Sequence, residues 1–146
     1  MPQPRWIGGY SFGGIVAFEM ARQLAQRGTP PQRVIIIDAP APLERAHHTS
    51  LVQYGAYLAY SPAPSPGQKL PLAIIRATTP RHSDLSDIEN RQLAIPDMGW
   101  QLFTDAAIPV LHITGDHVTM LGPVTASNVA AAIASLLHVT AAPDAP

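Results

Sequence analysis

The sequence contains no cysteine and few charged side chains. Of its 146 residues, none is cysteine and 13% are Asp, Glu, Lys or Arg, about half the ~25% typical of soluble proteins. The absence of cysteine excludes a disulfide framework, a thiolate metal site and a cysteine nucleophile. Nine basic against ten acidic side chains give a net charge of -1. This balance excludes the broad basic face that nucleic-acid binding requires.

Long apolar runs and metal-ligand spacings are also lacking. The most apolar late stretch, residues 129–139, is interrupted by Ser135 and His138, and it falls short of the roughly 20 residues of a membrane span. The N-terminus has no apolar run of the kind found in signal peptides, so we expect a cytoplasmic protein without membrane contact. None of the histidines stands in an H-x-x-x-H or H-E-x-x-H spacing, and no metal site is expected.

The spacing of the apolar residues predicts one domain of the α/β class. Apolar residues make up 47% of the chain, which is enough for a packed core. We expect strands at residues 6–8, 33–38, 72–75 and 110–113, and helices at residues 15–27, 51–60 and 124–138. Strands separated by helical or loop segments favour a mainly parallel sheet flanked by helices. His112, inside the last strand, is expected to be a hydrogen-bonded core residue.

One short motif indicates a nucleophile. Residues 9–13 read Gly-Tyr-Ser-Phe-Gly and match G-x-S-x-G between a short strand and a strong helix. A sharp strand-to-helix turn, built from Gly9, Tyr10 and Gly13, would hold Ser11 in a strained backbone geometry. The Phe12 amide, at the helix N-terminus, can then point at a developing oxyanion. The alternative is a purely structural glycine turn.

Two residues can supply the base and the acid that a serine nucleophile needs. Asp38 follows an apolar strand, at the end where α/β sheets present functional groups. His117 stands just after the last expected strand, so the order along the chain is Ser11, Asp38, His117, as in α/β-hydrolases. The alternatives are a strand-end cap for Asp38 and an ordinary loop histidine for His117.

The motif and its surroundings resemble thioesterase domains of polyketide and nonribosomal peptide synthases, which are α/β-hydrolases. Residues 9–14 with 17–21 resemble the nucleophile helix of these domains, and residues 34–38 resemble the next strand, whose last residue is the triad acid. Residues 72–77, 97–100 and 115–121 resemble a later strand, the tryptophan loop and the histidine loop. The resemblance covers most of the chain and is weakest over residues 44–69.

This resemblance implies a serine thioesterase. Ser11 would attack an acyl or peptidyl thioester on the phosphopantetheine arm of a carrier protein and release the chain by hydrolysis or cyclisation. His117 would take the serine proton, and Asp38 would orient the imidazole. The implied partner is an acyl or peptidyl carrier protein. No enzyme cofactor is implied, because the substrate itself carries phosphopantetheine.

The start of the chain departs from the family. Thioesterase domains have several strands and a helix before the nucleophile strand, whereas this sequence starts at that strand. We therefore expect the C-terminal portion of the α/β-hydrolase fold over residues 1–140, followed by a tail at 141–146. In the family the early part supplies a second oxyanion amide, so impaired activity is expected. The nucleophile strand would be an edge that is open to self-association.

The second departure concerns the lid. In the family a helical lid follows the acid, which here corresponds to about residues 39–70. This segment is short, and its single helix candidate at residues 51–60 carries Tyr54, Tyr57 and Leu58. These three side chains are expected to line the substrate channel.

Two other functions compete with the thioesterase. One is a general α/β-hydrolase esterase whose acid is Asp84 or Asp87, after the strand at residues 72–75, in place of Asp38. The other is an incomplete, non-catalytic domain that serves as an interaction piece for carrier proteins. Separate substitutions of Asp38 and Asp84 distinguish the first from the thioesterase.

Overall fold

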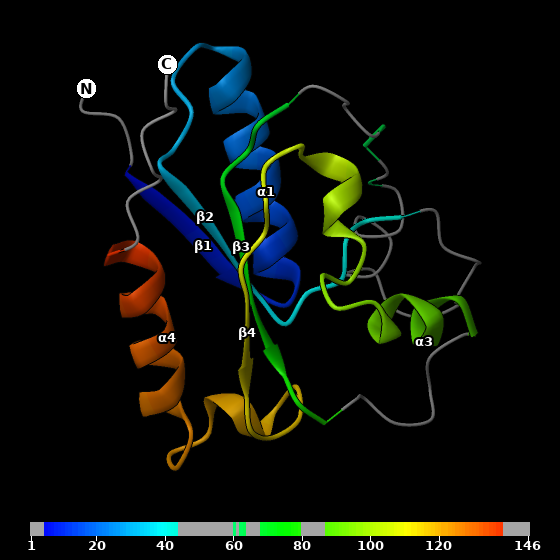
Figure 1. Ribbon diagram of the computed structural model, residues 1–146, viewed down its shortest axis with the longest axis vertical. Helices are drawn as coiled ribbons and strands as arrows, with labels where there is room; N and C mark the ends of the chain where they lie inside the picture. The colour runs from blue at the N-terminus through cyan, green and yellow to red at the C-terminus, as the bar shows by residue number, and fades with distance from the viewer. Residues whose placement is uncertain (1–4, 44–59, 61, 64–67, 80–86, 139–146) are drawn as a thin grey trace.

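The described residues of the computed structural model, 5–43, 60, 62–63, 68–79 and 87–138, form a sheet with helices around it (Figure 1). The four-stranded sheet has the order β1-β2-β3-β4, and every neighbouring pair is parallel. Its strands are β1 (Trp6–Tyr10), β2 (Arg33–Ile37), β3 (Leu72–Ala77) and β4 (Val110–Ile113). The α-helices are α1 (Phe12–Gln26), α3 (Asp87–Ala94) and α4 (Ala126–His138), and two 3-10 turns are η1 (Trp100–Phe103) and η2 (Thr119–Leu121).

Both faces of the sheet are covered, which explains the continuous apolar runs of its strands. Side chains alternate between the two faces of a strand. Val34 and Ile36 of β2 are buried in a core shared with Phe18 of α1, whereas Ile35 is buried in a second core shared with Val129 of α4. The first core also contains Trp100 and Phe103 of η1, and the second contains Met120 of η2. The sheet is therefore the middle layer of three, with α1 and α4 on opposite faces.

The predicted α/β class, the parallel sheet and the flanking helices are confirmed. The strand expected at residues 110–113 has those bounds, and the first helix begins at Phe12, directly after Ser11, rather than at residue 15. The sequence did not predict α3. The interpretation of His112 as a core residue is wrong, because its side chain is exposed on β4. In the described part of the chain β4 pairs with β3 alone, so it lies at the edge of the sheet.

Several predictions fall on residues that the structure does not describe. Tyr54, Tyr57 and Leu58 lie within residues 44–59, and the predicted tail lies within residues 139–146. The short lid, the channel lining and the tail at 141–146 therefore stay predictions. None of the helices in the described ranges is long and apolar enough to cross a membrane.

A polar cluster joins α1 to Tyr60. The Glu19 carboxylate accepts hydrogen bonds from the Arg22 guanidinium at 2.7 Å, from Gln23 Nε2 at 2.9 Å and from the Tyr60 hydroxyl. The bonds from Arg22 are the main cause that lowers the pKa of Glu19 from its usual 4.5 to about 2. Burial and the bond to Glu19 raise the pKa of Tyr60. The cluster thus needs an ionised Glu19 and a protonated Tyr60.

We expect Glu19→Gln to remove a stabilisation that depends on pH. A carboxyl whose pKa is lower in the folded state stabilises the fold above its unfolded pKa, and this contribution is lost as the pH falls. For Glu19 the loss runs from about 4.5 down to about 2. In urea unfolding, the wild-type chain should be more stable than the variant at pH 7, and the difference should shrink below pH 4.5. Parallel stability curves for the two proteins over that range would contradict the prediction.

Candidate active site

Ser11 occupies the strained turn between β1 and α1. Its backbone has φ 53° and ψ −125°, a conformation that residues other than glycine rarely adopt. The Ser11 amide donates to the Ile37 carbonyl at 2.9 Å, and the Ser11 carbonyl accepts from the Gly14 amide at 2.9 Å. The first bond continues the β1–β2 pairing and the second begins the helix. The serine therefore stands between two regular elements, which together hold its unfavourable dihedral angles.

The glycines of the motif allow the two elements to meet closely. A Cβ atom on Gly9 would lie 2.0 Å from the Gly13 carbonyl oxygen, and one on Gly14 would lie 3.1 Å from the Cβ of Ala39. Gly13 itself has no described atom within 4 Å of such a position. The closest approach in the turn is thus the one between the backbones of Gly9 and Gly13.

Asp38 directly follows β2 and is held by β3. Its amide donates to the Ile75 carbonyl at 2.7 Å, and its Oδ1 accepts from the Ala77 amide at 2.9 Å. Burial of the carboxyl raises its pKa, but hydrogen bonds from His117 and the Ala77 amide outweigh burial and hold the pKa of Asp38 below its usual 3.8. Asp38 is therefore ionised at neutral pH and fixed in orientation.

His117 follows β4 and lies between the other two residues. Its Nδ1 is 2.7 Å from Asp38 Oδ2, and its Nε2 is 3.1 Å from Ser11 Oγ. Only 9% of His117 is exposed. Because an ionised carboxylate only accepts hydrogen bonds, Nδ1 carries the proton and Nε2 is left to accept from the Ser11 hydroxyl. The structure thus brings together the three residues that the sequence selected, each at the carboxyl end of a parallel strand.

A tight turn sets the position of the histidine loop. The Asp116 carboxylate accepts from the Thr119 amide at 2.8 Å and from the Val118 amide at 2.9 Å. The bonds from Thr119 are the main cause that lowers the pKa of Asp116. Gly115 has φ 115°, and a Cβ there would lie 2.8 Å from Thr119 Oγ1. The loop that carries His117 is therefore closed by its own backbone amides.

The loop after Asp38 is held by residues that sequence reasoning did not select individually. Trp100 Nε1 donates to the Ala39 carbonyl at 2.7 Å, and Gln92 Nε2 donates to the Ala41 carbonyl at 2.7 Å. Both side chains are buried. The resemblance pointed to the tryptophan loop, but nothing in the sequence singles out Gln92. These two donors fix the backbone that follows the candidate acid.

The remaining predicted site residues are placed as follows. Phe12 is the first residue of α1, so its amide lies at the positive end of the helix dipole. The first turn of α1 carries no acidic residue that would oppose a negative charge there. Tyr10 ends β1 and packs against the His117 ring. Asp84 lies outside the described residues, and Asp87 begins α3.

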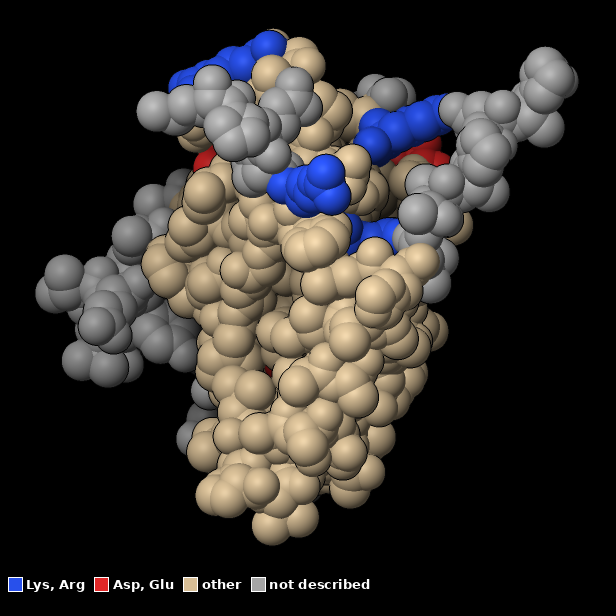
Figure 2. All heavy atoms as spheres, turned by 90° about the vertical axis from the view of Figure 1, so that its left-hand side faces the viewer, with Lys and Arg blue, Asp and Glu red and all other residues tan. Residues whose placement is uncertain are grey.

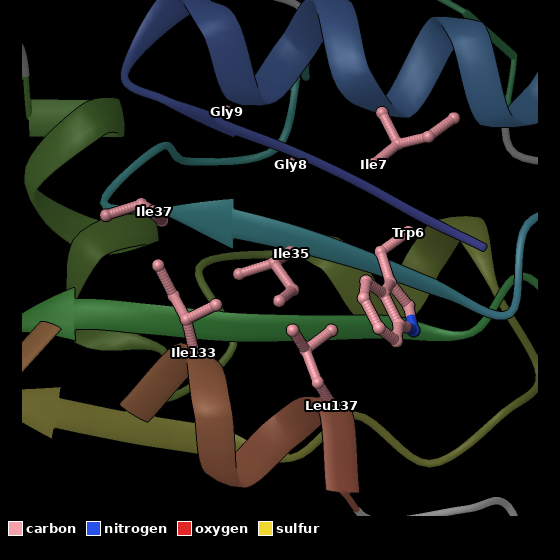
Figure 3. Close-up of a pocket in the computed structure, with 8 residues that line it drawn as sticks. All are labelled: Trp6, Ile7, Gly8, Gly9, Ile35, Ile37, Ile133 and Leu137. Carbon is pink, nitrogen blue, oxygen red and sulfur yellow. The ribbon is translucent and has the colours of Figure 1, made fainter. Parts of the chain in front are cut away.

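An apolar hollow is lined by residues other than Ser11, Asp38 and His117. It has a volume of about 290 Å³ between β1, β2 and α4 (Figure 3). Trp6, Ile35, Ile133 and Leu137 point toward one another there, and Trp6 is 49% exposed. Figure 2 shows the side of the molecule that carries α4, where most of the described surface lacks charge and the basic side chains gather at the upper end.

Comparisons with known proteins identify relatives of this chain. Residues 2–59 match the family model described as "Thioesterase domain". The chain is 52% identical over 42 residues to the orsellinic acid synthase armB of Armillaria mellea, a match that covers 29% of this chain and 2% of that protein. It is 54% identical over 37 residues to an orsellinic acid synthase of Beauveria bassiana, which covers 25% of this chain and 2% of that one.

Solved structures share the fold. The type II thioesterase BorB from the borrelidin biosynthetic cluster superimposes with a TM-score of 0.70 at 21% identity, over 94% of this chain and 64% of that one. The resemblance to thioesterase domains of polyketide and nonribosomal peptide synthases is thus confirmed. So is the prediction of part of an α/β-hydrolase fold. The matched segments of this chain cover about 2% of the length of those synthases.

Proposed function

Because this chain is a relative of the thioesterase domains of polyketide and nonribosomal peptide synthases, we propose that it is a serine thioesterase. Its substrate would be an acyl or peptidyl chain on the phosphopantetheine arm of a carrier protein. The observation that carries the proposal is the position of His117, 3.1 Å from Ser11 Oγ and 2.7 Å from Asp38 Oδ2. Nucleophile, base and orienting acid form such a chain of contacts in serine hydrolases.

The first half of the reaction forms an acyl-enzyme. Ser11 Oγ attacks the thioester carbonyl carbon while His117 Nε2 takes the hydroxyl proton. The imidazolium that results is stabilised by the ionised Asp38 beside Nδ1. The tetrahedral intermediate then collapses, its C–S bond breaks, and His117 returns the proton to the leaving sulfur. The products of this half are the Ser11 ester and a free phosphopantetheine thiol.

The oxyanion of the intermediate lies over the start of α1 in this proposal. The Phe12 amide donates to it, and the helix dipole adds to the stabilisation. A missing oxyanion donor lowers turnover about 10²- to 10³-fold. The impaired activity expected from the sequence stays a prediction, since it depends on how many donors the working protein presents.

The second half releases the chain. His117 Nε2 removes a proton from water, or from a hydroxyl or amine of the acyl chain, and the nucleophile attacks the ester carbonyl. When this intermediate collapses, the proton passes back to Ser11 Oγ. Water gives a free acid and an internal nucleophile gives a macrocycle. No enzyme cofactor enters either half.

Three further predictions concern self-association, location and the competing esterase. Self-association through β1 stays a prediction. In the described residues β1 pairs with β2 alone, and Trp6, its first residue, is half exposed. The cytoplasmic location also stays a prediction. The described contact of His117 is with Asp38, which supports Asp38 as the acid. Asp84 and the side chain of Asp87, the acids of the general esterase, lie outside the described residues, so that alternative stays untested.

The proposal is tested by intact-mass analysis after treatment with a fluorophosphonate. We expect one adduct on the wild-type chain, none on Ser11→Ala and strongly slowed labelling of His117→Ala, because the serine alone is a weak nucleophile. An acyl thioester and the matching oxygen ester then separate a thioesterase from a general esterase. A folded wild-type chain that takes no adduct, or an adduct that persists in Ser11→Ala, contradicts the proposal.

A further inference from the structure

Tyr10, the residue before the candidate nucleophile, makes two contacts with His117. Its ring stacks on the imidazole with centroids 4.7 Å apart and an angle of 22° between the planes. Its hydroxyl donates a hydrogen bond to the backbone carbonyl of His117. The two residues are 107 positions apart in the sequence. One side chain therefore contacts both the ring and the backbone of the candidate base.

The stacking restrains tilting of the imidazole plane, a movement that the other contacts of His117 restrain little. The bonds of His117 to Asp38 and Ser11 run from its two ring nitrogens, so they lie near the plane of the imidazole. Such bonds resist movement within the plane, but they resist tilting of the plane much less. An aromatic ring laid against the imidazole face blocks the tilt. The turn at Asp116 holds the loop itself, through the Val118 and Thr119 amides.

We propose that Tyr10 is a positioning residue for His117. Its ring fixes the plane of the imidazole, and its hydroxyl fixes how far the backbone of the histidine loop lies from β1. Because Tyr10 and Ser11 are adjacent in the chain, a displacement of this turn moves the nucleophile and the side chain that positions His117 together. This inference rests on the proposed function, since it assigns a role within the same site.

Three variants separate positioning from simple stabilisation. Tyr10→Leu removes both contacts, whereas Tyr10→Phe keeps the ring and removes only the hydroxyl. Trp6→Leu is the matched control: it removes an aromatic side chain from the same strand, and Trp6 points into the hollow beside α4 (Figure 3). Ser11→Ala reports on the proposed function alone.

The test measures kcat and KM with an acyl N-acetylcysteamine thioester. A misplaced base slows the chemical step by about 10- to 100-fold, so we expect kcat of Tyr10→Leu to fall by that factor with little change in KM. Loss of one hydrogen bond predicts a fall of about 2- to 10-fold for Tyr10→Phe, and Trp6→Leu should match the wild type. Wild-type kcat in both Tyr10 variants, or an equal fall in Trp6→Leu, overturns the inference.

A second measurement does not depend on turnover or on the leucine variant. The Nδ1 proton of His117, shared with Asp38, gives a low-field proton NMR signal when the imidazole is held in place. We expect this signal in the wild type and in Trp6→Leu, and a broadened signal in Tyr10→Phe. An unchanged signal in Tyr10→Phe overturns the inference even if Tyr10→Leu does not fold. Turnover that persists in Ser11→Ala would instead reject the proposed function.

Discussion

Replacing Asp38 by asparagine should lower kcat by about 10⁴-fold while the chain stays folded. The substitution keeps the shape of the side chain and changes only its hydrogen-bonding character. An asparagine oxygen can still accept from the Ala77 amide, which is 2.9 Å from Oδ1 in the wild type. The other end of the amide, an NH₂ group, would then face His117 Nδ1 in place of Oδ2.

The expected loss of kcat follows from the tautomer of His117 that an asparagine at position 38 favours. An NH₂ group donates, so Nδ1 of His117 must accept, and the ring proton moves to Nε2. A protonated Nε2 cannot take the proton of the Ser11 hydroxyl, which lies 3.1 Å away. The imidazolium also loses the negative charge that stabilises it. Both effects act on the chemical step, so kcat should fall far more than KM changes.

The measurement combines kinetics with unfolding. Turnover of an acyl thioester and the fluorophosphonate labelling rate should fall together in Asp38→Asn, while urea unfolding stays cooperative. Asp105→Asn is a control for the loss of one charge, because Asp105 is exposed and outside the site. If Asp38→Asn keeps the wild-type rate and Asp84→Asn or Asp87→Asn loses it, the general esterase is the better interpretation.

Local patterns were sufficient to predict most of the sheet and to select three residues that the structure brings into contact. Residues 34–37 are apolar without interruption, because both faces of β2 are buried. A G-x-S-x-G motif between a strand and a helix predicts where the serine lies. Asp38 and His117 follow strands, and the carboxyl ends of parallel strands meet at one edge of a sheet. Their proximity therefore follows from topology once the strands are known.

The contacts that hold the candidate site in place could not be predicted from short stretches of the sequence. The Ala77 amide that holds Asp38 is a backbone group, and any residue except proline at that position would supply it. Gln92 donates to a carbonyl 51 positions away, and Tyr10 contacts a residue on the last loop. The exposed His112 was misplaced for a related reason, because a short apolar segment does not reveal that its strand lies at the sheet edge.

The substitution Gly9→Ala should prevent the turn from forming. The added Cβ would lie 2.0 Å from the Gly13 carbonyl oxygen and 2.2 Å from the Gly13 carbonyl carbon. Both are backbone atoms of α1, so no side-chain rotation relieves the contact. Either β1 or the start of α1 must shift, and Ser11 lies between them. We expect a destabilisation of about 4 kcal/mol or more, or no folded protein, and no fluorophosphonate adduct.

Gly13→Ala is the matched control, because it makes the same change in the same motif. A Cβ at Gly13 has no described atom within 4 Å, and Gly13 has no positive φ. Since alanine restricts the unfolded chain and favours a helix, the free energy of unfolding should rise by about 0.4–1 kcal/mol. Urea unfolding of both variants measures the contrast. Equal stability of Gly9→Ala and the wild type would mean that the close approach of β1 and α1 does not hold the serine, and the strain at Ser11 would need another source.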